Sequence, residues 1–119
     1  NPVDGPALLV SSYTHPEYSV SMADTFALVQ ANALLIRGTE GEAVADARRT
    51  PKMQAFVAGK ATDLQAYQAG SLTTLPELPT AIDAASTAAY IQSVLNGESP
   101  VPAPIAEQVA HILQLHQAL

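Results

Sequence analysis

The chain has 119 residues, 48% of them hydrophobic and 13% charged, a composition typical of one folded domain and not of a disordered tail. It contains no cysteine, which excludes a disulfide framework, a cysteine zinc site and a cysteine nucleophile, and fits a cytoplasmic location. The sequence has no signal-peptide pattern and no apolar run near the roughly 18 residues of a membrane span, so we expect no membrane partner.

The charges are unevenly distributed. All five basic residues lie between positions 37 and 60, where they face three carboxylates, a net charge of +2. The remaining residues carry eight carboxylates and no cation, a net charge of −8. This asymmetry indicates a place where an anion could bind. A charged loop that only keeps the protein solvated would give the same pattern, because surface charges act weakly.

The first part of the chain has the pattern of a strand, a helix and a strand. Turn signals at 1–6 precede an apolar run at 7–13, which predicts a buried strand. Pro16 suits the first turn of a helix, which we expect to continue to about Asn32. A short apolar run at 33–36 predicts a second buried strand, parallel to the first. The helix would bury the face that carries Tyr18, Met22, Phe26 and Val29.

The middle of the chain is more polar. Residues 39–50 form a glycine-containing loop at the carboxyl end of the second strand, where ligands bind in open α/β sheets. Pro51 and Gly59 predict one short helix over 51–59. Loose alternation over 61–68 is typical of an edge strand. Two prolines make 72–79 an extended connector.

The last part predicts two helices. Asp83 can cap the first helix, which Asn96 and Gly97 close. Prolines 100, 102 and 104 enforce a stiff turn before the final helix. The apolar face of the first helix would carry Ala84, Ala88, Ile91 and Leu95, and that of the second would carry Ile105, Val109, Ile112, His116 and Leu119. We therefore expect His116 to be packed or interfacial and His111 to be solvated.

These elements predict an α/β fold. Residues 1–60 would form the βαβ unit and the basic loop, and residues 61–119 the edge segment, the connector and the two helices. Both predicted strands are apolar on both faces, so each expects helices on either side and neighbouring strands. The chain supplies too few of these, and we expect it to be part of a larger sheet.

The loop 37–42, Arg-Gly-Thr-Glu-Gly-Glu, is the one loop with recognisable site chemistry. Its spacing matches neither a Walker A loop nor a dinucleotide fingerprint. Glu40 and Glu42 could together hold Mg²⁺, which accepts one or two protein carboxylates and keeps water and phosphate oxygens. A solvated acidic turn has the same spacing, and the spacing alone favours that alternative.

The segment Arg48-Arg49-Thr50-Pro51-Lys52 is a compact basic patch. Its guanidinium groups could hold phosphates through paired hydrogen bonds, and a helix start there would add backbone N–H donors. The predicted anion site therefore consists of Arg37, Thr39, Arg48, Arg49 and Lys52. The net charge is small for nucleic acid, because strong binders neutralise about 6 to 10 phosphates.

Several of these segments resemble a known family. The run Thr14 to Tyr18, the loop 37–42 and the run Ala45 to Pro51 are similar to the C-terminal half of anthranilate phosphoribosyltransferase homologues, of glycosyl transferase family 3. More narrowly they resemble the YbiB-type paralogues of that family. The run Ala89 to Gly97 also resembles the family's late helix and the glycine that follows it. The resemblance spans nearly the whole chain.

The resemblance implies the C-terminal portion of a nucleoside phosphorylase/phosphoribosyltransferase-type α/β domain. The N-terminal helical domain and the glycine-rich phosphoribosyl pyrophosphate loop would be absent from this chain, which we expect to be a fragment, inactive alone. The full-length parent would be a homodimer that binds phosphoribosyl pyrophosphate or a related anion, with Mg²⁺ as a cofactor at Glu40 and Glu42. The resemblance identifies no catalytic residue.

Two alternatives stay open. Family enzymes carry an adjacent Asp-Glu pair in the metal-binding loop, whereas Gly41 separates Glu40 from Glu42 here. YbiB-type proteins are associated with nucleic-acid binding, so the resemblance also allows a non-catalytic nucleic-acid-binding protein on the same fold. The other alternative is that these residues serve only folding and dimer contacts.

Overall fold

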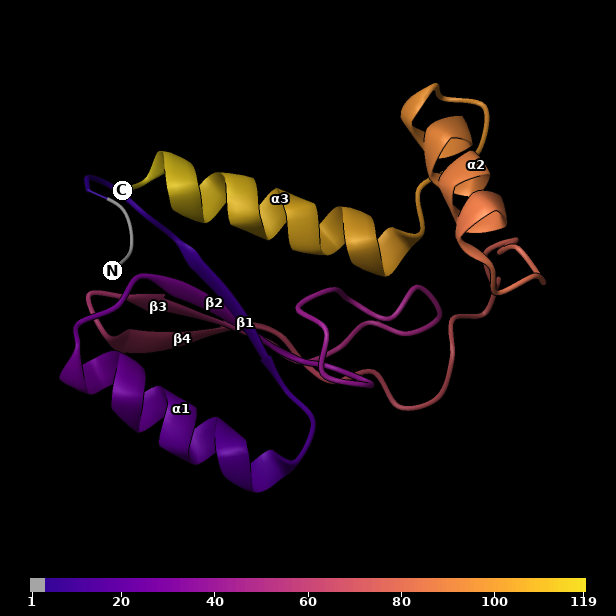
Figure 1. The fold of residues 1–119 in the computed structure, drawn as a ribbon. Helices are drawn as coiled ribbons and strands as arrows, with labels where there is room; N and C mark the ends of the chain where they lie inside the picture. The colour runs from indigo at the N-terminus through magenta and orange to yellow at the C-terminus, as the bar shows by residue number, and fades with distance from the viewer. Residues whose placement is uncertain (1–3) are drawn as a thin grey trace.

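The computed structural model describes residues 4–119, so part of the turn predicted at 1–6 lies outside the described residues. It consists of a four-stranded sheet and helices on both of its faces (Figure 1). In chain order the elements are β1 (Leu9–Tyr13), α1 (Pro16–Leu28), β2 (Ala33–Arg37), β3 (Met53–Val57), β4 (Lys60–Gln65), α2 (Ala84–Leu95) and α3 (Ala103–Gln117). The sheet order is β1-β2-β3-β4. The predicted α/β class is confirmed.

The βαβ unit is also confirmed. β1 and β2 are parallel, with Leu9 opposite Ala33. α1 begins at Pro16, after His15 at the N-cap, but it ends before the predicted Asn32. The reason is Gln30, whose φ of 50° is incompatible with a continuing right-handed helix. Asn32 then accepts the Ala58 N–H through its side chain at 2.9 Å, which ties the end of this connection to the β3–β4 turn.

The helix predicted over 51–59 is wrong, because this segment forms β3 and its turn. β3 pairs antiparallel with both β2 and β4. Ala58 and Gly59 have φ values of 49° and 79°, as in a type I′ two-residue hairpin turn. Gly59 therefore ends a strand and not a helix, and the basic patch at 48–52 precedes a strand. The basic patch therefore has no helix start to add backbone N–H donors to an anion site. The predicted edge strand is confirmed, because β4 lies at one edge of the sheet.

β2 is the centre of the structure. Its residues 33–36 have no exposed surface, as expected for a strand covered on both faces. On one face Leu35 and the edge-to-face pair Phe26 and Phe56, with ring centroids 4.9 Å apart, join the cluster beneath α1. On the other face Leu34, Ile36 and Met53 pack beneath α3. Figure 1 shows these two helices on opposite sides of the sheet.

α3 begins at Ala103, so Pro104 lies in its first turn, and its buried face shares Ile105 and Ile112 with the predicted face but is otherwise rotated. Its contacts with the sheet come from Ile105, Ile112 and Leu115, and Gln108 lies buried between them. Val109 is exposed. This rotation reverses the prediction for the two histidines, because His116 is exposed and His111 is half-buried.

α2 has the predicted start and end but not the expected packing. The Asp83 carboxylate accepts the Ser86 N–H at 2.8 Å, and Gly97 has a φ of 77°. None of the residues of α2 is buried, and Ile91 and Leu95 are exposed. In Figure 1 the helix stands to one side of the sheet, joined to it by the connector and by the turn before α3. Within residues 4–119 no helix is long and apolar enough to cross a membrane.

Gly59 provides a test of how closely the hairpin turn approaches α1. A β-carbon there would lie 2.9 Å from the Ala27 Cα and from the Phe26 carbonyl oxygen, at a φ of +79°. We expect Gly59→Ala to lower the free energy of unfolding by about 3 kcal/mol, from backbone strain and the clash together. Urea denaturation followed by circular dichroism measures the loss.

Gly97→Ala is the matched control. Gly97 has nearly the same φ, +77°, but a β-carbon there would have no heavy atom within 4 Å. Only the backbone strain applies, so the loss should be about 1 kcal/mol. Equal losses in the two variants would contradict the close approach of the turn to α1.

Candidate functional site

The loop that contains most of the predicted site residues follows β2 at the carboxyl ends of the two parallel strands. The Gly38 N–H donates to the Tyr13 carbonyl oxygen at 2.8 Å, which extends the β1–β2 pairing by one step. A β-carbon at Gly38 would lie 3.0 Å from the Glu42 carbonyl oxygen, so the loop folds back tightly over this glycine. The Ser12 hydroxyl donates to the Gly41 carbonyl oxygen at 2.7 Å. The loop therefore lies where the sequence predicts a ligand site.

Gln108 of α3 fixes the loop to the rest of the protein. Its side-chain oxygen accepts the Ala45 N–H at 2.8 Å, and its side-chain nitrogen donates to the Ala43 carbonyl oxygen at 2.9 Å. Gln108 is 4% exposed, and Ala45 joins the core cluster beneath α3. Buried polar groups need such partners, so the two bonds set the path of the loop.

Asp46 organises the loop from within. It accepts the backbone N–H of Arg48 at 2.9 Å, and its other carboxylate oxygen accepts the Thr39 hydroxyl at 3.3 Å. The Arg48 Nε lies 3.5 Å away, a charged contact. Burial acts to raise the pKa of Asp46, but the Arg48 N–H, the Arg48 charge and the Thr39 hydroxyl outweigh burial and hold that pKa below its usual value. Asp46 is therefore ionised at neutral pH.

Arg37 and Arg49 line a small pocket, which we call the arginine pocket. Its volume is about 160 Å³, and its lining also includes Thr14, Gly38, Thr39, Asp46, Pro51 and Tyr67. The guanidinium carbons of Arg37 and Arg49 lie 5.4 Å and 5.5 Å from the centroid of the Tyr67 ring, within the range of cation–π contacts. Within residues 4–119 the one ion pair joins Arg48 to Asp46, so neither pocket arginine forms an ion pair there.

The predicted anion residues separate into three groups. Arg37, Thr39 and Arg49 meet in the arginine pocket. Arg48 is paired with Asp46 and lines a neighbouring hollow of about 340 Å³, which shares Thr39 and Asp46 with the pocket. Lys52 lines neither hollow; its carbonyl oxygen accepts the Arg37 N–H at 3.1 Å.

Glu40 and Glu42 line the neighbouring hollow together with Asp46. The Glu42 carboxylate accepts the Glu40 N–H at 3.3 Å, so one of the two carboxylates also closes the turn. Among the described residues, 4–119, no three His, Asp or Glu side chains are grouped to hold a metal ion by themselves. The pair fits Mg²⁺ as an ion completed by waters and ligand phosphate oxygens. Their role as metal ligands stays a prediction.

Tyr67 and Gln108 are site residues that the sequence does not reveal. Tyr67 follows the edge strand and lies 30 positions from Arg37, and Gln108 lies 63 positions from Ala45. No spacing rule connects residues so far apart, and neither side chain belongs to a motif. The nearest signal is a glutamine on the apolar side of the last helix, next to Ile105 and Ile112 in helical spacing.

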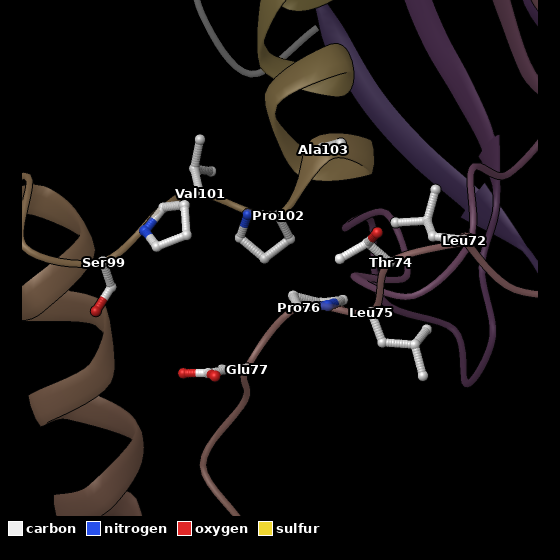
Figure 2. Close-up of a pocket in the computed structure, with 10 residues that line it drawn as sticks. Leu72, Thr74, Leu75, Pro76, Glu77, Ser99, Val101, Pro102 and Ala103 are labelled. Carbon is white, nitrogen blue, oxygen red and sulfur yellow. The ribbon is translucent and has the colours of Figure 1, made fainter.

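A second type of cavity lies away from the charged loop. It has a volume of about 410 Å³ and lies between the connector and the turn that precedes α3. Figure 2 shows Leu72, Leu75 and Val101 around it, and Glu77 is the one charged residue in its lining. With no cation in that lining, this cavity is unsuited to the anion that the basic loop could bind.

No family model matches the chain. It is 36% identical over 107 residues to the uncharacterized protein YbiB of Escherichia coli (strain K12), a match that covers 90% of this chain and 33% of that protein. The chain thus spans about a third of the length of the curated relative that it matches. The match supports the relation to YbiB-type proteins.

Replacement of Gln108 tests whether its two hydrogen bonds fix the loop. Gln108→Leu would leave the buried Ala45 N–H and the part-buried Ala43 carbonyl group without their partner. We expect a loss of about 3 kcal/mol in the free energy of unfolding, since each unsatisfied buried group costs about 1–3 kcal/mol. Urea denaturation measures this loss, and amide hydrogen exchange at Ala45 should accelerate.

Gln114→Leu on the same helix is the control. Gln114 is exposed, so its replacement should change stability by less than about 0.5 kcal/mol. If Gln108→Leu were as mild as this control, the loop would be held by other contacts.

Proposed function

We propose that the chain binds a phosphate-bearing anion through Arg37 and Arg49. We further propose that it does so as the C-terminal part of an anthranilate phosphoribosyltransferase-like protein, whose ligand is phosphoribosyl pyrophosphate or a related anion. The observation behind the proposal is that two guanidinium groups lie against one aromatic ring, line one pocket and have no carboxylate partner within residues 4–119. Two cations against the single Asp46 carboxylate in that lining leave a net positive charge, which favours an anionic ligand.

The size and lining of the pocket favour a phosphate group. A volume of about 160 Å³ has room for roughly five waters at about 30 Å³ each, which suits one phosphate with some hydration. Pockets that hold whole small molecules are larger, about 300–1,000 Å³. Arginine forks match phosphate oxygens, and Thr14 and Thr39 add hydroxyl groups to the lining. The remainder of the ligand would lie outside the pocket.

In this proposal the neighbouring hollow is the magnesium site. Glu40 and Glu42 would hold the ion there, beside Thr39 and Asp46, which line both hollows. A bound Mg²⁺ would neutralise charge on a pyrophosphate group. Transferase activity belongs to the full-length parent in this proposal, with Arg37 and Arg49 as binding residues and the chain alone inactive.

The proposal includes the rest of the parent as a partner. In the sheet of residues 4–119, β1 has a neighbour on one side only, whereas strands of parallel sheets are normally buried. The relative is about three times as long as the matched segment. We propose that the missing part supplies strands beside β1 and the second wall of the site. We also propose a homodimer, on the basis of the family resemblance. A cytoplasmic location is proposed because the sequence contains no cysteine.

Titration of the chain with inorganic pyrophosphate, by calorimetry with and without Mg²⁺, tests the anion site. Arg37→Met and Arg49→Met should each weaken binding about tenfold or more, because a hydrogen bond to a charged group contributes about 1.5–3 kcal/mol. Glu40→Gln and Glu42→Gln should remove only the part of the affinity that depends on Mg²⁺. Lys60→Met removes the same charge at the start of β4, opposite the last residue of β3, and should change little. Unchanged affinity in both arginine variants would exclude this site.

The second candidate function is non-catalytic binding of a nucleic-acid strand. It is favoured by the combination of charge with an aromatic ring at Tyr67, and by Arg48, whose side chain is 62% exposed on the same loop. Successive phosphates of one strand could contact Arg49 and Arg48 in turn. The separation of Glu40 from Glu42 by Gly41, unlike the adjacent Asp-Glu pair of the family enzymes, also favours this alternative.

Fluorescence anisotropy with a labelled single-stranded oligonucleotide, at several salt concentrations, separates the two candidates. A nucleic-acid site should weaken in Arg48→Ala/Arg49→Ala, with a salt slope reduced by about 0.7 for each lost phosphate contact. It should also be unaffected by Glu40→Gln/Glu42→Gln. Absent or salt-independent binding would leave the phosphoribosyl-type ligand as the better candidate.

A further inference from the structure

Tyr67 is placed at the arginine pocket without contributing to the core. It is 46% exposed and belongs to neither of the two buried clusters. An aromatic ring that is partly in water at this position can serve a ligand site as well as packing. The Tyr67 ring lies close to both guanidinium groups of the pocket.

The backbone next to Tyr67 is held against the basic loop. The Gln68 N–H donates to the Thr50 carbonyl oxygen at 3.1 Å, and the Gln68 side chain accepts the Thr50 N–H at 2.9 Å. Further along, the Leu72 N–H donates to the Arg48 carbonyl oxygen at 2.9 Å. The segment 67–72 thus runs beside residues 48–50, and the position of the ring over Arg49 follows from backbone pairing.

The ring offers the two arginines a contact that does not cancel their charge. Like charges on Arg37 and Arg49 repel each other, and both side chains have many rotamers in water. A carboxylate would hold them but would also neutralise them, and Asp46, which lines the pocket, instead contacts Thr39 and Arg48. The negative face of an aromatic ring attracts a guanidinium while leaving its N–H donors free for a ligand.

We propose that Tyr67 is the positioning residue of the arginine pocket, holding Arg37 and Arg49 ready for an anion. This inference rests on the proposed anion binding at that pocket. Tyr67 acts through the two arginines by reducing the rotamer freedom that they would otherwise lose on binding. The aromatic face, and not the hydroxyl group, performs this role.

Two substitutions in the whole 119-residue chain separate the ring from its hydroxyl group. Tyr67→Phe keeps the aromatic face, so its affinity for inorganic pyrophosphate should match that of the unsubstituted chain within about twofold. Tyr67→Leu removes the face and should weaken pyrophosphate binding about five- to thirtyfold, the sum of two exposed cation–π contacts. Tyr18→Leu is the control, because Tyr18 is similarly exposed but its ring lies 6.0 Å from that of His15.

A spectroscopic readout reports the positioning directly. In nuclear magnetic resonance spectra the Nε–H signals of Arg37 and Arg49 should carry a ring-current shift that persists in Tyr67→Phe and disappears in Tyr67→Leu. Retained shifts in Tyr67→Leu, or equal loss of affinity in the Phe and Leu variants, would overturn the inference. If Tyr67→Leu left the pyrophosphate affinity unchanged while Arg37→Met still weakened binding, the inference would also be overturned. The anion site would then be supported without a role for Tyr67. If the unsubstituted chain did not bind pyrophosphate, both the proposed anion site and the positioning role of Tyr67 would be excluded.

Discussion

The geometry of the site depends on Gln108, which connects a loop without regular structure to a helix that is fixed on the sheet. Residues 38–50 contain neither helix nor strand, so their path needs an external reference. Gln108 provides it by bonding both Ala43 and Ala45, while Ile105 and Ile112 on the same helix pack against the cluster around β2. A buried amide with both of its groups satisfied fixes a conformation more sharply than apolar contacts do, because any shift leaves a polar group unpaired.

With the path of the loop fixed, electrostatics divides the arginines between two tasks. Asp46 pairs with Arg48, its neighbour but one, and accepts the Thr39 hydroxyl. Since this carboxylate is committed, Arg37 and Arg49 form no ion pair within residues 4–119 and share the Tyr67 ring. The net charge of the segment is therefore a poor guide to the site. What matters is that one cation is used for structure and two others are left to face the pocket.

The sequence predicts those parts of the fold that local patterns determine. The apolar run of β2, Pro16 at the start of α1 and the Asp83 cap of α2 are local signals, and each is confirmed. Gly59 is ambiguous in sequence, because a glycine after a short apolar segment suits both a helix end and a hairpin turn. The pairing of β3 with β2 decides for the hairpin, and β2, Ala33–Arg37, lies 20 positions before β3 in the sequence. Tyr67 and Gln108 join the site only through that tertiary arrangement, so no local pattern marks them.

Under the proposed function, the arginine pocket would recognise a phosphate group but would not select one phosphate ligand among many. A pocket of about 160 Å³ contacts little beyond the phosphate itself, and guanidinium forks bind the phosphates of sugars and of nucleic acids alike. Selection must come from groups outside the pocket. Arg37 ends β2, and the strand beside it, β1, forms one of the two edges of the sheet. Residues that reach the ligand from beyond β1 are therefore the ones that would distinguish a ribosyl pyrophosphate from a polynucleotide strand.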